Sequence, residues 1–272
     1  MTNQKIRLVH SFSTCDTTSE LLRLHTYYFT LSAIYAKRSG FSIVLHTDSK
    51  GASLLKHAPY DKIIIDLDTC SKPAPRIYAW PKFEAMRNEA PGAIHIDGDV
   101  FLKRSSLQNL LSLGDYDLIV QSIEQKGVDN WGWLWNESTI AFARCEYPSW
   151  MRRDCLAMYN CGVVGFKNKA IQEEYRKYYL ALTSEYAKVG IDLNSVPDLI
   201  AEQQLLYDFA KHKKLKVKTL LDFPKLTESA DKIGYQHIIG CSKSIFFEKC
   251  KQKIKKFNRE IFNALEETKW EA

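Results

Sequence analysis

Two aspartates separated by one glycine, Asp97 and Asp99, directly follow the apolar segment Ala93 to Ile96. Along an extended backbone, side chains at positions i and i+2 point to the same side, so both carboxylates can face one ligand. Two hard oxygen ligands suit Mg²⁺ or Mn²⁺, with a diphosphate completing the coordination shell. Gly98 lets the chain bend and lets a ligand approach the backbone. The motif predicts a divalent cation site, and the alternative is a turn in which an aspartate caps a loop.

The segments around these aspartates predict the sheet that must position them. Helical patterns separate the apolar segments of the first hundred residues, and this β-α-β alternation favours a mainly parallel sheet flanked by helices. Ligand sites of such sheets lie at the carboxyl ends of the strands. The strands we expect are Ile6 to Phe12, Phe41 to His46, Lys62 to Leu67, Ala93 to Ile96, Asp117 to Ser122, Asn160 to Phe166 and Leu215 to Leu221. The helices we expect are 17–39, 76–88, 169–188 and about 197–211.

Composition narrows the class of protein. The chain has 272 residues, of which 45% are apolar and 12% aromatic, so it is an ordinary globular chain and not a disordered one. None of its seven cysteines forms a C-x-x-C pair, which disfavours a zinc site or a disulfide framework and favours reduced thiols in the cytoplasm. We find neither a signal peptide nor a membrane-spanning segment, and we expect a cytoplasmic protein.

The net charge of +6 is unevenly distributed. Five lysines without an acid lie within 211–218, and seven basic residues with one acid lie within 243–259, so the rest of the chain is net negative. This distribution argues against nucleic-acid binding. The tail 244–272 has apolar residues near helical spacing among its lysines. It either packs on the domain, which we favour, or lies peripherally on the inner face of an anionic membrane, near a lipid-linked acceptor.

Four short segments extend the chemistry beyond the aspartates. They are Tyr78-Ala79-Trp80-Pro81-Lys82-Phe83, His95-Ile96-Asp97-Gly98-Asp99-Val100, Tyr159-Asn160-Cys161-Gly162-Val163-Val164-Gly165 and His237-Ile238-Ile239-Gly240-Cys241-Ser242-Lys243. In this order they resemble the motifs of GT-A-type glycosyltransferases, most closely the family 8 retaining transferases, which include bacterial lipopolysaccharide galactosyl- and glucosyltransferases. The resemblance covers residues 6–243. Glu202 stands where that family usually has Asp, and no Pro-Trp follows Lys243.

The resemblance implies a GT-A-like α/β domain over 1–243, with a nucleotide-binding half at about 1–100, an acceptor half at 101–243 and a basic helical tail at 244–272. It implies metal-dependent transfer of a hexose from a UDP-sugar to a glycan or glycolipid hydroxyl, with retention, as in polysaccharide biosynthesis. Asp97, Asp99 and His237 would bind Mn²⁺ or Mg²⁺. Lys243 and Gly240 would hold the donor diphosphate.

Further residues take roles by the same resemblance. Lys82 and Arg76 would steady the diphosphate or the donor sugar, and Asn160 would bind the sugar or the acceptor. Gln203 would lie beside the anomeric carbon, and Glu202 would bind sugar hydroxyls or, in an inverting enzyme, act as general base. Residues after the first two strands offer hydroxyls, amides and a carboxylate for a uracil and a ribose: Ser11, Phe12, Ser13 and Asp48. Three alternating tryptophans, Trp131, Trp133 and Trp135, could stack on acceptor sugars or form one buried face.

Two other functions remain open. A phosphatase of the haloacid dehalogenase type also uses D-x-D, with the first Asp attacking phosphorus and the second moving the proton. It needs a downstream carboxylate pair for Mg²⁺, and no D-D or G-D-x-x-x-D follows residue 99. The third reading is a basic binding module without catalysis.

Overall fold

A computed structural model describes residues 6–15, 17–68, 79–125, 145–152, 157–189, 200–222, 224–240 and 242–270. Two compact units make up the chain. Unit 1 combines Met1–Cys70, Ala93–Ser112 and Thr227–Ala272, and unit 2 combines Ser71–Gly92 and Leu113–Leu226. Arg76 and the three alternating tryptophans lie outside the described residues. The described part of the chain contains no helix that is both long and apolar enough to cross a membrane.

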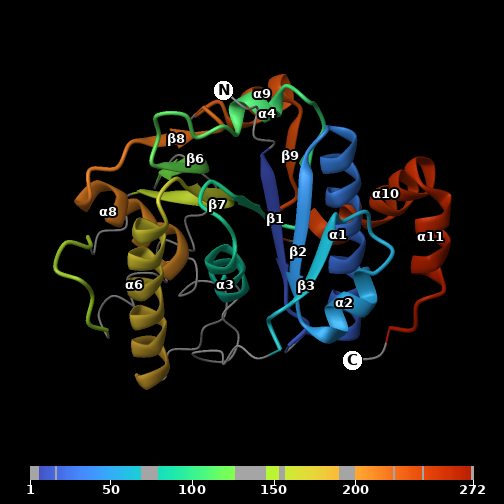
Figure 1. Cartoon of the computed structure of the whole chain (residues 1–272), viewed down its shortest axis with the longest axis horizontal. Helices are drawn as coiled ribbons and strands as arrows, with labels where there is room; N and C mark the ends of the chain where they lie inside the picture. Colours follow the sequence, from blue (N-terminus) through green and yellow to red (C-terminus); the bar gives the residue numbers. More distant parts are fainter. Residues whose placement is uncertain are drawn as a thin grey trace. The chain divides into compact units, whose positions relative to one another are not determined.

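Unit 1 is built on four parallel strands in the order β3-β2-β1-β4 (Figure 1). Their bounds are β1 (Arg7–Phe12), β2 (Ser42–Thr47), β3 (Lys62–Ile65) and β4 (Ile94–Ile96). Strand β1 is central, because Leu8 pairs with Ile43 on one side and with Ile94 on the other. Its long buried run is typical of a strand covered on both faces. The strands predicted at 6–12, 41–46, 62–67 and 93–96 are therefore confirmed, with small differences at their ends.

A second ladder in unit 1 connects distant parts of the sequence. Strands β5 (Val100–Leu102) and β9 (Tyr235–His237) pair antiparallel, with Val100 opposite His237. The other elements of this unit are α1 (Ser19–Arg38), α2 (Ser49–Leu55), α4 (Leu107–Leu110), α9 (Leu226–Ile233), α10 (Ser242–Phe257) and α11 (Arg259–Glu266). Because β5 begins one residue after Asp99, this ladder brings the chain near residue 237 to the end of β4.

The C-terminal tail packs on α1. Cys250 and Ile254 of α10 and Ile261 and Leu265 of α11 are buried in one cluster with tyrosines of α1. Figure 1 shows both helices, in red, beside α1. The tail is two helices rather than the one that its periodicity predicted, because Asn258 interrupts it and caps α11 by accepting a hydrogen bond from the amide of Ile261 at 3.0 Å. The structure shows that the tail packs on α1, and contact of its outer face with a membrane stays a prediction.

Unit 2 contains three paired strands in the order β7-β6-β8. Strands β6 (Leu118–Gln125) and β7 (Ala157–Phe166) are antiparallel, and β8 (Val217–Thr219) runs parallel to β6. Its helices are α3 (Trp80–Asn88), α6 (Lys169–Lys188) and α8 (Leu205–His212), and a π-helical turn, η1 (Ile200–Gln204), leads into α8. Both units combine helices with strands, and the β3-β2-β1-β4 pairs of unit 1 are all parallel, so the predicted α/β class is confirmed.

Candidate active site

Three side chains that could bind a metal ion lie together in unit 1 at the carboxyl end of β4. Asp97, Asp99 and His237 each offer one ligand atom, and these atoms all lie within 4.8 Å of one another. Asp97 and Asp99 lie in the turn between β4 and β5, and His237 is the last residue of β9. The amide of Ile238 donates to the carbonyl of Asp99 at 3.1 Å, which fixes the two segments together. The structure thus brings together the three residues that the sequence proposed as metal ligands.

Asp99 is the electrostatic centre of this cluster. Its side chain lies 3.3 Å from Nε2 of His237 and 2.7 Å from Nζ of Lys243, and the residue is only 8% exposed. Burial by itself raises the pKa of a carboxyl, but the charges and hydrogen bonds of His237 and Lys243 outweigh it and hold the pKa of Asp99 well below its usual range. The carboxylate is therefore ionised, as a metal ligand must be.

Lys243 is positioned by the start of α10. The hydroxyl of Tyr28 donates to its carbonyl at 2.7 Å, and its own amide donates to the carbonyl of Gly240 at 3.1 Å. Gly240 has a φ of +57°, in the left-handed region that favours glycine. An added Cβ there would meet nothing within 4 Å, so backbone conformation explains this glycine. Gly240 thus lies in the turn that precedes α10, and Lys243 lies in the first turn of that helix, from which its side chain reaches Asp99.

A buried histidine that the sequence reasoning did not assign lies beside Asp97. His95 on β4 forms a hydrogen bond of 2.9 Å from Nε2 to Oγ of Ser11, and its Nδ1 lies 3.8 Å from Oδ1 of Asp97. The hydroxyl of Ser11 thus bonds to His95, and its predicted contact with a nucleotide stays a prediction. The i, i+2 spacing of His95 and Asp97 was the available signal, because alternate residues share one face of a strand.

Gly98 is required by packing against α1. A Cβ at this position would lie 2.3 Å from ring carbons of Phe29. We therefore expect Gly98→Ala to destabilise unit 1 by about 1–3 kcal/mol, the usual cost of overpacking, and to displace both aspartates. Urea unfolding and Mn²⁺ binding measure these effects. In a Phe29→Ala background the same substitution should cost much less. An unchanged midpoint for the single variant would show that Phe29 yields freely and that Gly98 has another purpose.

The residues predicted to bind the nucleotide also make hydrogen bonds that stabilise the local structure. Asp48 caps α2 by accepting from the amide of Gly51 at 2.7 Å, and it accepts from the amide of Thr14 at 2.6 Å. The carbonyl of Phe12 accepts from Oγ1 of Thr47 at 2.6 Å, and Ser13 is half-buried in the following loop. These contacts join the ends of β1 and β2. Recognition of a uracil or ribose there stays a prediction.

A second polar cluster lies in unit 2. Lys82 on α3 is 5% exposed, and Glu202 on η1 is 7% exposed. Nζ of Lys82 donates to the carboxylate of Glu202 and, at 2.9 Å, to the carbonyl of Cys161. The hydroxyl of Tyr175 donates to the carbonyl of Glu202 at 2.6 Å. The structure thus joins two predicted site residues in a buried ion pair, and Gln203 follows them half-buried on the same turn.

Asn160 is held by a glutamate that the sequence reasoning missed. Its Nδ2 donates to Oε1 of Glu124 at 2.7 Å, and its Oδ1 accepts from the amide of Gly162 at 3.0 Å. Asn160 and Glu124 are both buried, on β7 and β6. Only the pairing register of these strands brings the two side chains together, so no local sequence pattern could have revealed this contact.

Comparisons with solved structures find distant similarities. The glycosyltransferase GlyE of Streptococcus pneumoniae TIGR4 is 13% identical with a TM-score of 0.46, and the match covers 98% of this chain and 62% of that one. The galactosyltransferase LgtC, in complex with donor and acceptor sugar analogs, is 11% identical over 97% of this chain and 98% of that one, with a TM-score of 0.49. The 4-diphosphocytidyl-2C-methyl-D-erythritol synthase of Anaerococcus prevotii DSM 20548 is 14% identical over 91% of this chain and 99% of that one, with a TM-score of 0.44.

The match covers nearly all of LgtC but only part of GlyE. This chain spans less than two thirds of the length of GlyE. Among curated proteins, none matches the sequence. One family model does match, over residues 19–268, which is most of the chain. The chain therefore belongs to a family of unknown function, DUF6734.

Proposed function

We propose that the protein is a divalent-cation-dependent glycosyltransferase that moves a hexose from a nucleotide sugar, UDP-linked, to a glycan or glycolipid hydroxyl with retention. The observation that carries the proposal is the cluster of Asp97, Asp99 and His237 beside Lys243. Two carboxylates and an imidazole suit Mn²⁺ better than Mg²⁺, because neutral imidazole is a softer ligand than oxygen. The ammonium group of Lys243, which lies beside Asp99, provides a compact positive charge for a phosphate.

The residues present fit such an ion. Asp97, Asp99 and His237 would hold it, and when bound it stabilises negative charge on a departing nucleoside diphosphate. Asp99 is already ionised, and the imidazole of His95, which is hydrogen-bonded to Ser11, lies beside Asp97. Lys243 would bind a donor phosphate oxygen through its ammonium group. Gly240 sets the turn that brings this lysine to the cluster.

Polar residues of unit 2 are our candidates for sugar binding. Asn160, Glu202 and Gln203 are our candidates for contacts with sugar hydroxyls, and Lys82 fixes the position of the Glu202 carboxylate. Glu202 lies within the π-helical turn η1, and π-helical turns are frequent at functional sites. Because Lys82 and Glu202 are buried and paired, the Glu202 carboxylate has one defined orientation, as a binding or catalytic group needs.

We also propose peripheral contact with the cytoplasmic face of an anionic membrane, through the outer face of α10. The inner face of this helix is buried on α1, so the contact would use exposed residues. Lys249, Lys255 and Lys256 are exposed there, and Ile245 is 77% exposed. Lysines beside an exposed apolar residue favour binding to anionic lipid.

The test is hydrolysis of UDP-galactose and UDP-glucose by the purified chain, followed as release of UDP. We expect slow release that requires Mn²⁺ and stops with a chelator. His237→Gln should lose the dependence on Mn²⁺, and His57→Gln, at an exposed site in the same unit, should keep it. A mass-spectrometric screen of nucleotide sugars then identifies the donor.

Two results would contradict the proposal. One is that no nucleotide sugar is hydrolysed and none protects the chain against heat, with or without Mn²⁺. The other is hydrolysis of a simple phosphate monoester through a covalent intermediate on Asp97, which would establish the phosphatase alternative.

A further inference from the structure

The carboxylate of Asp99 has a nitrogen partner at each of its oxygens. Its Oδ2 lies 2.7 Å from Nζ of Lys243, and its Oδ1 lies 3.3 Å from Nε2 of His237. All three residues belong to unit 1, and the Asp99 side chain is buried. A metal ion that binds Asp99 must therefore accept Lys243 as a close neighbour or displace its ammonium group.

Lys243 is fixed at its backbone and free to rotate at its side chain. Tyr28 donates to its carbonyl, and the helix that begins beside it is held on α1 by buried Cys250 and Ile254. Its side chain is 26% exposed, so the ammonium group can reach a ligand in solution. Within the described part of the chain, Asp99 is the one acid at ion-pair distance from Lys243. The ammonium group thus has two alternatives, the Asp99 carboxylate or an anion that arrives from outside.

The charge of Lys243 also acts on a histidine of α1. His25 lies one turn before Tyr28, on the same face of the helix. Burial, and next the charge of Lys243, lower the pKa of His25 to about 4, in spite of the opposite effect of Asp99. An additional positive charge is therefore unfavourable at this histidine, although an ionised carboxylate acts on it as well.

A divalent cation on Asp97, Asp99 and His237 would meet the same difficulty. It would lie within a few ångströms of the ammonium group that contacts Asp99, and like charges at such distances repel strongly where burial limits screening by water. A phosphate group removes this repulsion, because its oxygens can bind the ammonium group and the cation together. The cation and the phosphate then each raise the affinity of the chain for the other.

We propose that Lys243 makes this site selective for a divalent cation that binds together with a phosphate group, over the free cation. The inference rests on the proposed function and gives Lys243 a second role beside its contact with the donor phosphate. The two roles predict opposite effects of one substitution. Removal of the charge should strengthen binding of the cation alone and weaken binding of UDP.

Titration of the full chain with Mn²⁺, followed through the electron paramagnetic resonance signal of the free ion, measures the first effect. We expect Lys243→Met and Lys243→Gln to bind Mn²⁺ alone at least about fivefold more tightly than the wild type, the lower end of usual coupling between two ligands. Their affinity for UDP at saturating Mn²⁺, measured by calorimetry, should fall at least about tenfold, because one charge-assisted contact is lost. Lys243→Arg keeps the charge and should bind Mn²⁺ alone as weakly as the wild type.

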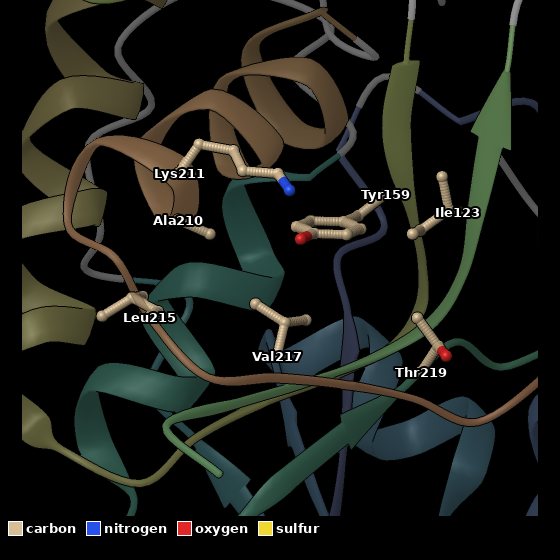
Figure 2. A pocket seen from close by; sticks show the side chains of 7 residues that line it. All are labelled: Ile123, Tyr159, Ala210, Lys211, Leu215, Val217 and Thr219. Atoms are coloured by element: carbon tan, nitrogen blue, oxygen red, sulfur yellow. The ribbon is translucent and has the colours of Figure 1, made fainter.

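Lys211 provides a matched lysine outside the cluster. It is exposed in unit 2, where its amine extends toward the ring of Tyr159 in a pocket of about 240 Å³ (Figure 2). Lys211→Met removes the same charge and should leave both affinities within about twofold of the wild type, since salt screens exposed charges outside the site. This control separates the local effect of Lys243 from the effect of net charge.

The possible failures are distinguishable. If the wild type binds Mn²⁺ and UDP but neither neutral variant binds Mn²⁺ more tightly, the inference is overturned and the proposed function stands. Tighter binding of Mn²⁺ alone by Lys243→Arg or Lys211→Met, equal to that of Lys243→Met, would overturn the inference as well. A wild-type chain that binds no Mn²⁺, with or without UDP, would overturn the proposed function and the inference together.

Discussion

Asp99→Asn is expected to abolish Mn²⁺-dependent release of UDP while the chain stays folded. The side chain keeps its shape but loses the charge that holds the ion, and Asp99 is the group that both His237 and Lys243 contact. Turnover should fall at least about a hundredfold, the scale for removing one group that stabilises charge in a transition state. Steady-state kinetics at saturating Mn²⁺ and circular dichroism of the same preparation measure the two effects.

The fold should tolerate this change because Lys243 is partly exposed, so its ammonium can turn to water when Asp99 loses its charge. Asp115→Asn is the matched control, since this aspartate is exposed and lies outside the cluster. It should retain full activity. Activity in Asp99→Asn that still depends on Mn²⁺ would move the metal site to other residues.

Glu202→Gln is expected to lower the free energy of unfolding by about 3–5 kcal/mol, the cost of breaking a buried ion pair. Lys82 and Glu202 are both buried, so the substitution removes the carboxylate that Glu202 provides to a buried ammonium group. Replacing both residues together, Lys82→Met with Glu202→Gln, should recover most of the loss because no buried charge then remains at these two positions. Urea unfolding of the single and double variants gives the comparison.

An exposed pair provides the control for this effect. Lys188 and Glu185 form an ion pair at the surface of α6, so Glu185→Gln should leave the urea midpoint almost unchanged. Should Glu202→Gln unfold at the wild-type midpoint, the pair with Lys82 does not stabilise unit 2. Should the double variant be as unstable as the single one, the loss comes from packing rather than from the unpaired charge.

Much of unit 1 could be predicted from the sequence, because its signals are local. Apolar runs between helical patterns located β1 to β4, and the spacing of Asp97 and Asp99 after β4 placed two carboxylates at one strand end. The match of His237 and Lys243 to a family motif brought two more groups to that point.

The remaining contacts depend on pairing between distant segments. The hydrogen bond from Asn160 to Glu124 follows from the register of β6 and β7, and the need for glycine at position 98 follows from Phe29 on α1. Asp48 shows a different limit, since the same carboxylate suits a ribose hydroxyl and a helix cap, and the structure uses it as a cap. A residue type that serves both purposes cannot be assigned from spacing alone.

The proposed function requires that Asp97, Asp99 and His237 form a divalent cation site, and a measurement of Mn²⁺ binding shows whether they do. Electron paramagnetic resonance of free Mn²⁺, titrated with the purified chain in the presence and absence of UDP, counts the bound ions without relying on catalysis. We expect one Mn²⁺ per chain, bound more tightly with UDP and lost in Asp99→Asn. An unchanged free Mn²⁺ signal with the wild-type chain, or equal binding by Asp99→Asn, would contradict it.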